Sequence, residues 1–492
     1  MTIGGGGTIQ NHMLTEIQPA KTSSFDDHHP PSKELLSDCV HCGFCLPACP
    51  TYVLWGEEMD SPRGRIYMMA KAAQGEARLD QNLLTHMDNC LGCMACMTAC
   101  PSGVQYDKLI EDTRAQIERN IPRTTPDRLF RRLLFATFPY PRRLRLMAGP
   151  LLLYQRLGLQ SLVRASGLLK LLPRRLAAMD SLLPTVPAYF NWTMPEKIAP
   201  TGTPRGRVGM LTGCVQQVFF SHVNAATARV LAAEGFEVIT PASQPCCGAL
   251  MVHSGLEDQA GAMARSLITL FEAANVDAIV INAAGCGSTM KGYGHLLRDD
   301  PQWSDRARAF SAKCKDITEI LCGVPSIAPR HPIPIRIAYH DACHLRHAQG
   351  IYQQPRQLLS AIPQLEVDEI AETSLCCGSA GVYNLLQPEA AQELGDRKVS
   401  HLLDVRAQAV VSANPGCLLQ LMSGLRRRGE RTLPAFHMIE LLDASICGLT
   451  TDQILSGQKN LSFPLSVSVP SASAGWSAPS GRGCSASTVE RW

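Results

Sequence analysis

Two cysteine runs with the same spacing constrain this chain more than any other feature. Each run reads C-x2-C-x2-C-x3-C-P, and together they contain Cys39, Cys42, Cys45 and Cys49 before Pro50, then Cys90, Cys93, Cys96 and Cys100 before Pro101. Three thiolates separated by two residues can lie on one tight loop, whose amides hydrogen-bond to bound sulfur. The proline after the fourth cysteine fixes its own φ and turns the chain away. The runs therefore predict metal-cluster ligands.

The repeated triple is typical of two-cluster ferredoxins, in which the fourth cysteine of each run serves the other 4Fe-4S cluster. Structural zinc sites are the alternative, but zinc uses separated C-x2-C pairs and four ligands. We therefore predict two 4Fe-4S clusters, the first held by Cys39, Cys42, Cys45 and Cys100 and the second by Cys90, Cys93, Cys96 and Cys49.

Length and composition predict a globular chain of several domains in a reducing compartment. The 492 residues are 45% hydrophobic and 18% charged, and the net charge of +3 does not favour nucleic acid as a partner. Twenty cysteines in so long a chain do not resemble a short secreted disulfide scaffold. Residues 1–31 lack the apolar core of a signal peptide, and the apolar run 146–154 is too short to span a membrane. We expect a cytoplasmic protein, soluble or peripheral on the inner membrane.

The first part of the chain divides into three predicted segments. Residues 1–33 contain glycine and histidine runs and are predicted to be a flexible leader, followed by a helical two-cluster ferredoxin-like domain over 34–125. Inside that domain Ser61 and Pro62 predict a capped helix start. Arg63 and Arg65 then face a cluster, an acidic partner or solvent.

Residues 126–204 are predicted to be a basic amphipathic helical segment and a proline-rich linker. Between residues 128 and 175 the chain holds 11 Lys and Arg residues, no Asp or Glu, and many leucines. This pattern suits an anionic membrane surface or an acidic partner subunit. The alternative is an ordinary helical linker whose arginine stems cover a core.

The remaining cysteines form an internal repeat. The first copy has Cys214, Cys246, Cys247 and Cys286, and the second has Cys343, Cys376, Cys377 and Cys417. The steps to the cysteine pair are 32 and 33 residues, and those from the pair to the last cysteine are 39 and 40. We predict two modules, 205–330 and 331–448, each with one Cys-Cys-Gly step.

Each module is predicted to be a parallel α/β unit. Short apolar runs at 208–211, 278–281, 335–339 and 409–411 read as buried strands, each ending just before a cysteine. Ligands of parallel sheets collect at the carboxyl ends of the strands, so the four thiols of each module should converge on one crevice. Convergent thiols suit a further iron–sulfur centre or zinc, while the vicinal pairs could instead act as redox thiols.

The fold class is thus a multidomain α+β and α/β protein, with a helical cluster domain before two α/β modules. His340, His344 and His347 flank Cys343, and each is either a ligand or an ordinary hydrogen-bonded histidine. The segment 449–492 is rich in Ser, Pro, Gly and Ala and is predicted to be disordered. We assign no role to Cys314, Cys322, Cys447 and Cys484.

With these motifs in place, the chain resembles the iron–sulfur subunits of bacterial glycolate oxidases. The matching stretches are 39–45, 49–52, 60–67, 100–104, 224–231, 285–287 and 375–381. The resemblance implies a complex in which a separate FAD-containing subunit oxidises glycolate to glyoxylate and this subunit passes electrons on, to the quinone pool or another acceptor. The paired modules also resemble heterodisulfide reductase, whose modules end in C-x2-C. Here Cys286 and Cys417 lack that fifth thiol, which argues against a non-cubane cluster.

Two classes of function remain open from the sequence. The first is an electron-transfer subunit of a dehydrogenase for glycolate, lactate or glycerol 3-phosphate, with no catalytic residue of its own. It is favoured because no G-x-G-x-x-G dinucleotide fingerprint is present, so substrate oxidation would belong to the partner. The second is a thiol-disulfide reductase that acts at the Cys-Cys-Gly crevices. A metal-storage protein is a weaker third alternative.

Overall fold

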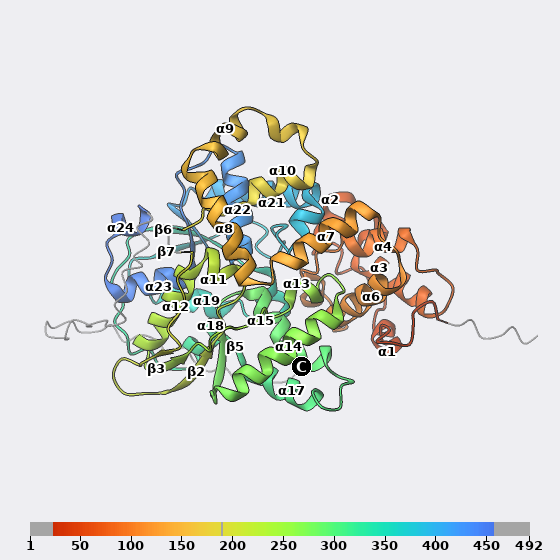
Figure 1. The fold of residues 1–492 in the computed structure, drawn as a ribbon, viewed down its shortest axis with the longest axis horizontal. Coiled ribbons are helices and arrows are strands. Elements are labelled where there is room, and N and C mark those ends of the chain that lie inside the picture. Colours follow the sequence, from red (N-terminus) through yellow and green to blue (C-terminus); the bar gives the residue numbers. More distant parts are fainter. Residues whose placement is uncertain (1–22, 188–189, 457–492) are drawn as a thin grey trace, which may run out of the picture.

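The segment that carries the two cysteine runs is helical, as Figure 1 shows in red and orange on the right of the molecule. The computed structural model describes residues 23–187 and 190–456. The helices of this part are α1 (Lys33–Ser37), α2 (Pro50–Trp55), α3 (Pro62–Ala73), α4 (Gln81–Asn89), α5 (Ala95–Thr98) and α6 (Tyr106–Asn120), with a 3-10 turn η1 (Glu58–Asp60).

Helix α3 begins at the predicted position. The Ser61 hydroxyl accepts a hydrogen bond from the Gly64 amide at 3.0 Å, and Pro62 occupies the first turn, where no amide donor is needed. The helix then turns Arg65 into the interior, where its side chain is 1% exposed. Arg63 lies at the surface, where its guanidinium pairs with Glu58.

Part of the predicted leader packs onto this domain. Phe25 is 5% exposed and belongs to its apolar core. Asp26 accepts hydrogen bonds from Arg119 at 3.1 Å and from Asn120 at 2.8 Å, both on α6. Residues 23–31 therefore lie on the cluster domain instead of forming a free leader, while residues 1–22 lie outside the described residues.

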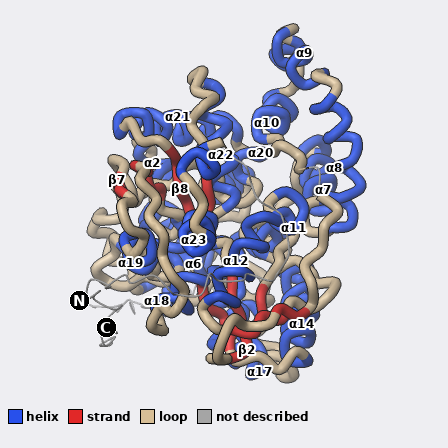
Figure 2. Tube along the Cα trace, turned by 90° about the vertical axis from the view of Figure 1, so that its left-hand side faces the viewer, coloured by secondary structure: helices blue, strands red, loops and turns tan. Residues whose placement is uncertain are grey.

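The basic segment forms an arm of helices that extends from the body, and Figure 2 shows α9 at its outer tip. Its elements are α7 (Thr125–Thr137), α8 (Pro141–Arg156), α9 (Leu159–Ala165), η2 (Leu168–Leu171) and α10 (Arg174–Leu182). The arm returns to the second module, where Arg426 donates a hydrogen bond to the Ser181 carbonyl at 2.9 Å. No helix among residues 23–187 and 190–456 is long and apolar enough to cross a membrane.

The first module contains a five-stranded sheet in the order β1-β3-β2-β4-β5. Its strands are β1 (Lys197–Ile198), β2 (Gly206–Met210), β3 (Phe236–Ile239), β4 (Ala278–Ile281) and β5 (Cys314–Asp316), all parallel except β1. Its helices are α11 (Val215–Phe219), α12 (Ser221–Ala233), α13 (Ala249–Val252), α14 (Glu257–Ala273), α15 (Ala284–Lys291), α16 (Tyr293–Leu296), α17 (Ser304–Lys313) and α18 (Ile317–Cys322).

The second module repeats this plan with a parallel sheet in the order β7-β6-β8-β9. Its strands are β6 (Arg336–His340), β7 (Glu366–Glu369), β8 (Ala409–Ser412) and β9 (Ala435–His437). Its helices are η3 (His344–Ala348, a π-helical turn), α19 (Gln353–Ser360), α20 (Tyr383–Leu386), α21 (Pro388–Val405), α22 (Pro415–Arg427), α23 (Met438–Cys447) and α24 (Thr451–Leu455). Helix α24 lies in the segment predicted to be disordered, and residues 457–492 lie outside the described residues.

The predicted parallel strands are confirmed, and the two modules pair their central strands alike. Val208 of β2 pairs with Ala278 of β4, as Ile337 of β6 pairs with Ala409 of β8. The modules also share one apolar core and an ion pair, in which Arg229 Nε lies 2.9 Å from Asp443 Oδ1. They therefore form one body, and the carboxyl ends of β2, β4, β6 and β8 each lead into a cysteine segment.

Candidate metal centres

The structure gathers four thiols of the cluster domain near the surface. Cys39, Cys45 and Cys100 are half-buried, and Cys42 is exposed. Burial raises the pKa of Cys39, and the neighbouring Cys100 and Cys42 sulfurs add to the rise. Burial also raises the pKa of Cys45 to about 11. The last cysteine of the second run thus lies beside the first run, which is the set predicted for the first cluster.

A second group of four thiols lies deeper, and its members are Cys49, Cys90, Cys93 and Cys96, all buried. Burial raises the pKa of Cys96 well above its usual range, and the sulfurs of Cys93, Cys90 and Cys49 act in the same direction. The fourth cysteine of the first run therefore lies with the second run. This is the set predicted for the second cluster.

Two buried arginines surround the deeper thiols. Arg65 Nη1 lies 4.0 Å from Cys49 Sγ, and its Nη2 donates to Asp60 Oδ1 at 3.0 Å. Although burial opposes the change, Arg65 and then Arg114 lower the pKa of Cys90 below its ordinary value. Positive charge at this depth stabilises thiolates, which are the form that binds iron.

The first module brings its four predicted cysteines together at the ends of its strands. Cys214 Sγ lies 3.6 Å from Cys246 Sγ, and this contact, together with burial, raises the pKa of Cys214 well above its usual range. Cys247 interacts through hydrogen bonds with both Cys246 and Cys286. The predicted thiols of this module therefore form one continuous group.

The second module repeats the arrangement and adds a histidine. Cys343 Sγ lies 3.7 Å from Cys376 Sγ. Hydrogen bonds with Cys376, Cys417 and His340 lower the pKa of Cys377 well below its usual range, although burial opposes the shift. The adjacent residues Cys376 and Cys377 thus connect Cys343 with Cys417.

The glycine of the second Cys-Cys-Gly step is required by geometry. Gly378 has φ of +87°, and a Cβ there would lie 2.6 Å from the carbonyl oxygen of Ala391 on α21. Gly248 in the first module has a similar φ of +80°, but its nearest contact would be 3.4 Å away, at Ala260. The glycine lets the loop turn and bring the paired thiols against the neighbouring helix.

All eight module cysteines line one cavity of about 260 Å³ between the two modules. The sequence predicted one crevice per module, whereas the structure joins them into a shared space. The rest of the wall is largely apolar, and part of it comes from the arm through Phe138, Met179, Leu182 and Leu183. A shared cavity of this kind allows both thiol groups to act on one bound molecule.

The deeper thiols of the cluster domain lie against the second module. Cys93 shares a packed cluster with Cys343 and Cys376, and the Cys343 sulfur contributes to the raised pKa of Cys93 after burial. Thr98 Oγ1 also lies 2.7 Å from His347 Nδ1 across the same interface. His347 is therefore a hydrogen-bonded interface residue, which was one of the two alternatives open from sequence.

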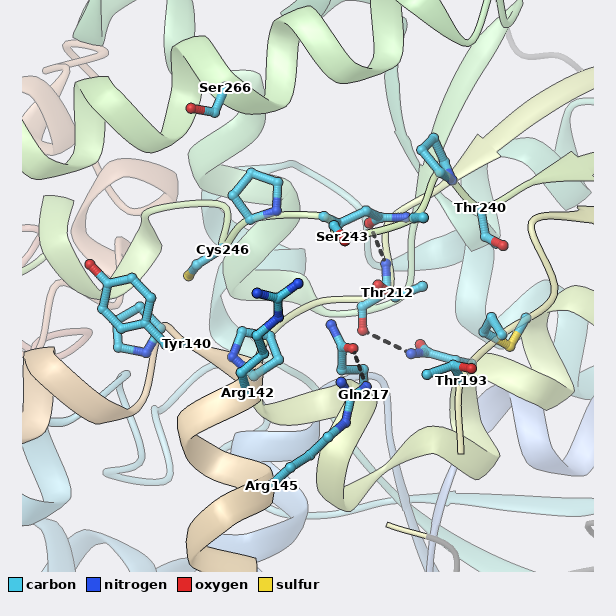
Figure 3. Close-up of a pocket in the computed structure, with 18 of the residues that line it drawn as sticks. Tyr140, Arg142, Arg145, Thr193, Thr212, Gln217, Thr240, Ser243, Cys246 and Ser266 are labelled. Carbon is cyan, nitrogen blue, oxygen red and sulfur yellow. Dashed lines mark hydrogen bonds between the residues drawn. The ribbon is translucent and has the colours of Figure 1, made fainter. Parts of the chain in front are cut away.

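A wider cleft of about 990 Å³ opens beside the first module, and Figure 3 shows its walls. Arg142 and Arg145 of α8 line it, and Arg145 Nη2 donates to Gln217 Oε1 at 2.6 Å. Cys246 lines this cleft as well as the inner cavity. The first module's thiols can therefore be approached from the arm side.

The donor chemistry of the cluster domain fits 4Fe-4S clusters. Each of its two groups offers four thiols, all from cysteines of the repeated triple and its partner run. The raised pKa values of Cys45, Cys93 and Cys96 mean that iron must displace protons when it binds there. The module groups are also soft thiol sets, which suit iron–sulfur centres or zinc.

Comparison with known proteins identifies the parts of the chain. The 4Fe-4S dicluster domain family matches residues 35–104, and the cysteine-rich domain family matches 208–291 and 337–422. The linker region of the glycolate oxidase iron–sulfur subunit matches 126–183. A probable glycolate oxidase iron–sulfur subunit of Bacillus subtilis is 40% identical over 413 residues, which cover 83% of this chain and 93% of that protein. The chain belongs to the glycolate oxidase iron–sulfur subunit family.

Further relatives agree with this membership. The glycolate oxidase iron–sulfur subunit of Escherichia coli is 33% identical over 84% of this chain and 94% of its own length. Lactate utilization protein A of an Exiguobacterium species is 29% identical over 49% of this chain and 98% of its own length. The resemblance seen in the sequence is confirmed. A glycolate oxidase iron–sulfur subunit is the electron-transfer part of an oxidoreductase complex, and it carries two 4Fe-4S clusters.

The sequence named the sixteen cysteines that the structure gathers, but it missed the groups that surround them. Arg114 lies on α6, beyond the last cysteine of the run, and nothing in its local pattern distinguishes it from a surface arginine. The sequence allowed Arg65 to face a cluster, an acidic partner or solvent, and only its burial in the structure decides among these. The apolar wall contributed by the arm likewise has no local signal.

Proposed function

We propose that this chain carries electrons from a partner flavin subunit, which oxidises glycolate to glyoxylate, to a quinone acceptor. The observation that carries the proposal is the continuous order of the thiol groups. They run from exposed Cys42, through buried Cys93, to Cys343 and the shared cavity. When bound, the clusters would accept and release single electrons, so the order of their ligands sets the order of transfer.

The proposed ligands follow the two groups of the cluster domain. The outer cluster would be held by Cys39, Cys42, Cys45 and Cys100, and the inner cluster by Cys90, Cys93, Cys96 and Cys49. The module groups Cys214, Cys246, Cys247 and Cys286, and Cys343, Cys376, Cys377 and Cys417, would each hold a further iron–sulfur centre. Arg65 and Arg114 would stabilise the inner thiolates and favour the reduced, more negative state.

The flavin subunit would dock where the outer thiols reach the surface. Phe44 and Val40, in the loop of the first run, are 66% and 68% exposed beside exposed Cys42. Exposed apolar side chains around a redox centre suit a partner surface. Replacing Phe44 with Ser should slow reduction by the flavoprotein and leave the cluster potentials unchanged. A matched replacement at exposed Leu171, on the arm, should leave that rate unchanged.

The shared cavity would receive the acceptor. Its largely apolar walls and its eight thiols suit a flat apolar molecule that must lie close to a metal centre. Quinone reduction takes two electrons and two protons, so two neighbouring one-electron centres in the modules would match its stoichiometry. This supports a quinone over a one-electron acceptor.

The arm would hold the complex at the cytoplasmic face of an anionic membrane. Its exposed side chains are both apolar, such as Leu146 at 77% and Leu171 at 82%, and basic, such as Arg132, Arg142 and Arg156. Basic charge and apolar area together bind anionic lipid surfaces. The chain should co-sediment with vesicles that contain phosphatidylglycerol, and replacing the three arginines with Gln should leave it in the supernatant. Equal sedimentation of both proteins would contradict the membrane contact.

The decisive experiment uses the complex purified with its flavoprotein. We expect glycolate to reduce the clusters of the complex, and the flavoprotein alone to oxidise glycolate without reducing quinone. D-Lactate and glycerol 3-phosphate, added in turn, distinguish glycolate from the related substrates. Oxidation of glycolate by the isolated iron–sulfur chain would contradict the assignment, as would clusters that glycolate cannot reduce in the complex.

A thiol-disulfide reductase is the second candidate, because the paired thiols of both modules face one cavity. The cavity would then bind a disulfide, which takes two electrons and two protons to give two thiols. A relative from Methanothermobacter marburgensis, named as part of a CoM/CoB fumarate reductase, shares 33% identity over 49% of this chain and 46% of its own length. A paramagnetic signal that depends on an added disulfide, and that is lost in Cys376→Ser, would favour this function over quinone reduction.

A further inference from the structure

The second module holds a histidine among its thiols. His340 is the last residue of β6, and the ligand atoms of His340, Cys377 and Cys417 all lie within 4.8 Å of one another. His340 is 1% exposed, and both cysteines are buried with it. One imidazole nitrogen and two sulfurs thus face a common point, as three ligands of one metal centre do.

The histidine has a polar atom that the protein does not satisfy. His340 Nδ1 is buried and has no hydrogen-bond partner. A buried nitrogen without a partner destabilises the fold unless something binds it. A metal bound by Cys377 and Cys417 would take the His340 ring nitrogen that faces these two sulfurs, with the ring proton on the other nitrogen.

The first module shows that the fold itself does not need an imidazole there. Its counterpart is Leu211, which precedes Cys214 by the same three residues that separate His340 from Cys343. Leu211 is 2% exposed and packs in one apolar cluster with Cys214, Cys246 and Cys247. The two modules therefore place their thiols alike, but the second has an imidazole nitrogen where the first has the apolar side chain of Leu211.

A second histidine offers the main competing assignment. His344 Nδ1 lies 3.6 Å from Cys343 Sγ, and the His344 ring packs against the His253 ring at 4.9 Å between centroids. His344 thus reaches one thiol at the edge of the group, whereas His340 reaches two at its centre. The geometry favours His340.

We propose that His340 is a ligand of an iron–sulfur centre in the second module, beside Cys377 and Cys417. The inference rests on that module holding such a centre, and not on the identity of the electron donor or acceptor. A neutral imidazole in place of a thiolate reduces the negative charge on a cluster and raises its reduction potential, as in Rieske centres. The second module would then be the more oxidising of the two, and it is the one that lies against Cys93.

The test is pulsed electron paramagnetic resonance on the full chain, isolated anaerobically. We expect nitrogen hyperfine coupling in the wild-type protein, and a changed coupling after labelling with ¹⁵N-histidine. The coupling that responds to this label should be absent in His340→Leu, which copies the first module, and retained in the control His344→Leu. The cluster-domain centres have only thiol ligands, so they do not contribute a coupling that changes on ¹⁵N-histidine labelling.

A second variant covers the case in which His340→Leu does not fold. His340→Cys supplies a thiolate instead, so it should keep the centre, lose the nitrogen coupling and lower the midpoint potential. The proposal is overturned if the wild-type protein shows no coupling that changes on ¹⁵N-histidine labelling, if that histidine coupling survives in either His340 variant, or if His340→Cys leaves the potential unchanged.

Iron analysis distinguishes a failure of the His340 ligand assignment from a failure of the proposed function. Two 4Fe-4S clusters account for about eight irons per chain, and more iron is expected if the modules are loaded. Iron above that level without nitrogen coupling would refute the histidine ligand alone. Iron at about eight per chain would show that the second module holds no iron–sulfur centre, and it would refute that part of the proposed function as well.

Discussion

The two Cys-Cys-Gly steps allow a matched test of how the module loops are built. Gly378→Ala forces a side chain into a left-handed backbone conformation, which costs about 1–2 kcal/mol. Its Cβ would also lie 2.6 Å from the Ala391 carbonyl oxygen and 2.9 Å from the Ala391 Cα. Overpacking of this kind costs about 1–3 kcal/mol, so the total is about 2–5 kcal/mol.

Gly248→Ala is the control because it has the same backbone strain without the overlap. Its nearest contacts, at 3.4 Å, are ordinary, so we expect only about 1–2 kcal/mol. Both variants keep every predicted ligand. Any difference between them therefore reports the packing of the loop against α21 in one module and α14 in the other.

Hydrogen exchange measures the two effects separately within the folded chain. Since 1.4 kcal/mol is a factor of ten, α21 amides should exchange about 30-fold faster or more in Gly378→Ala. The exchange rate of the α14 amides should increase by a smaller factor in Gly248→Ala. Equal acceleration in the two variants, or a larger one in Gly248→Ala, would refute the steric argument.

Three further outcomes are expected. Arg65→Met should leave Asp60 buried with a weaker counter-charge, lowering the unfolding free energy by about 3–5 kcal/mol and lowering the inner cluster's potential; denaturant titration and redox titration measure the two effects. Burial, with Asp107 and Asp112, raises the pKa of Glu111 from 4.5 to about 8, so the folded state binds its proton more tightly than the unfolded chain. The thermal midpoint should therefore fall as pH rises from about 5 to about 8, and Glu111→Gln should flatten that slope. Removal of iron should leave Cys96 protonated, so reloading at constant pH should release protons that a pH-stat records; no release would contradict its raised pKa.

The chemistry of the chain is readable from local sequence. Ligand type and loop geometry are set within about a dozen residues, so the C-x2-C-x2-C-x3-C-P runs predict thiolate clusters without any tertiary information. The apolar runs before Cys214, Cys286, Cys343 and Cys417 likewise predict four parallel strands, because buried strands need continuous apolar sequence. The capped start of α3 at Ser61 follows from one backbone turn.

The orientation of side chains and the contacts between distant segments could not be predicted from local sequence. Arg63 and Arg65 are two residues apart on one helix, yet one pairs with Glu58 at the surface and the other lies buried beside Cys49. Residues 23–31 have the composition of a leader, but Asp26 meets α6 more than 90 residues later. Such contacts depend on which distant elements pack together, and local pattern does not carry that information.

The sequence by itself determined the identity of the sixteen thiols, their four groups and the repeat that relates the modules. Only the tertiary structure decided that the two module groups face one cavity, that Cys93 lies against Cys343, and that His340 joins one group while Leu211 occupies its place in the other. The physical reason is distance along the chain. Ligand spacing is local, whereas the order of the centres arises where the cluster domain, the arm and two sheets bury their apolar faces against one another.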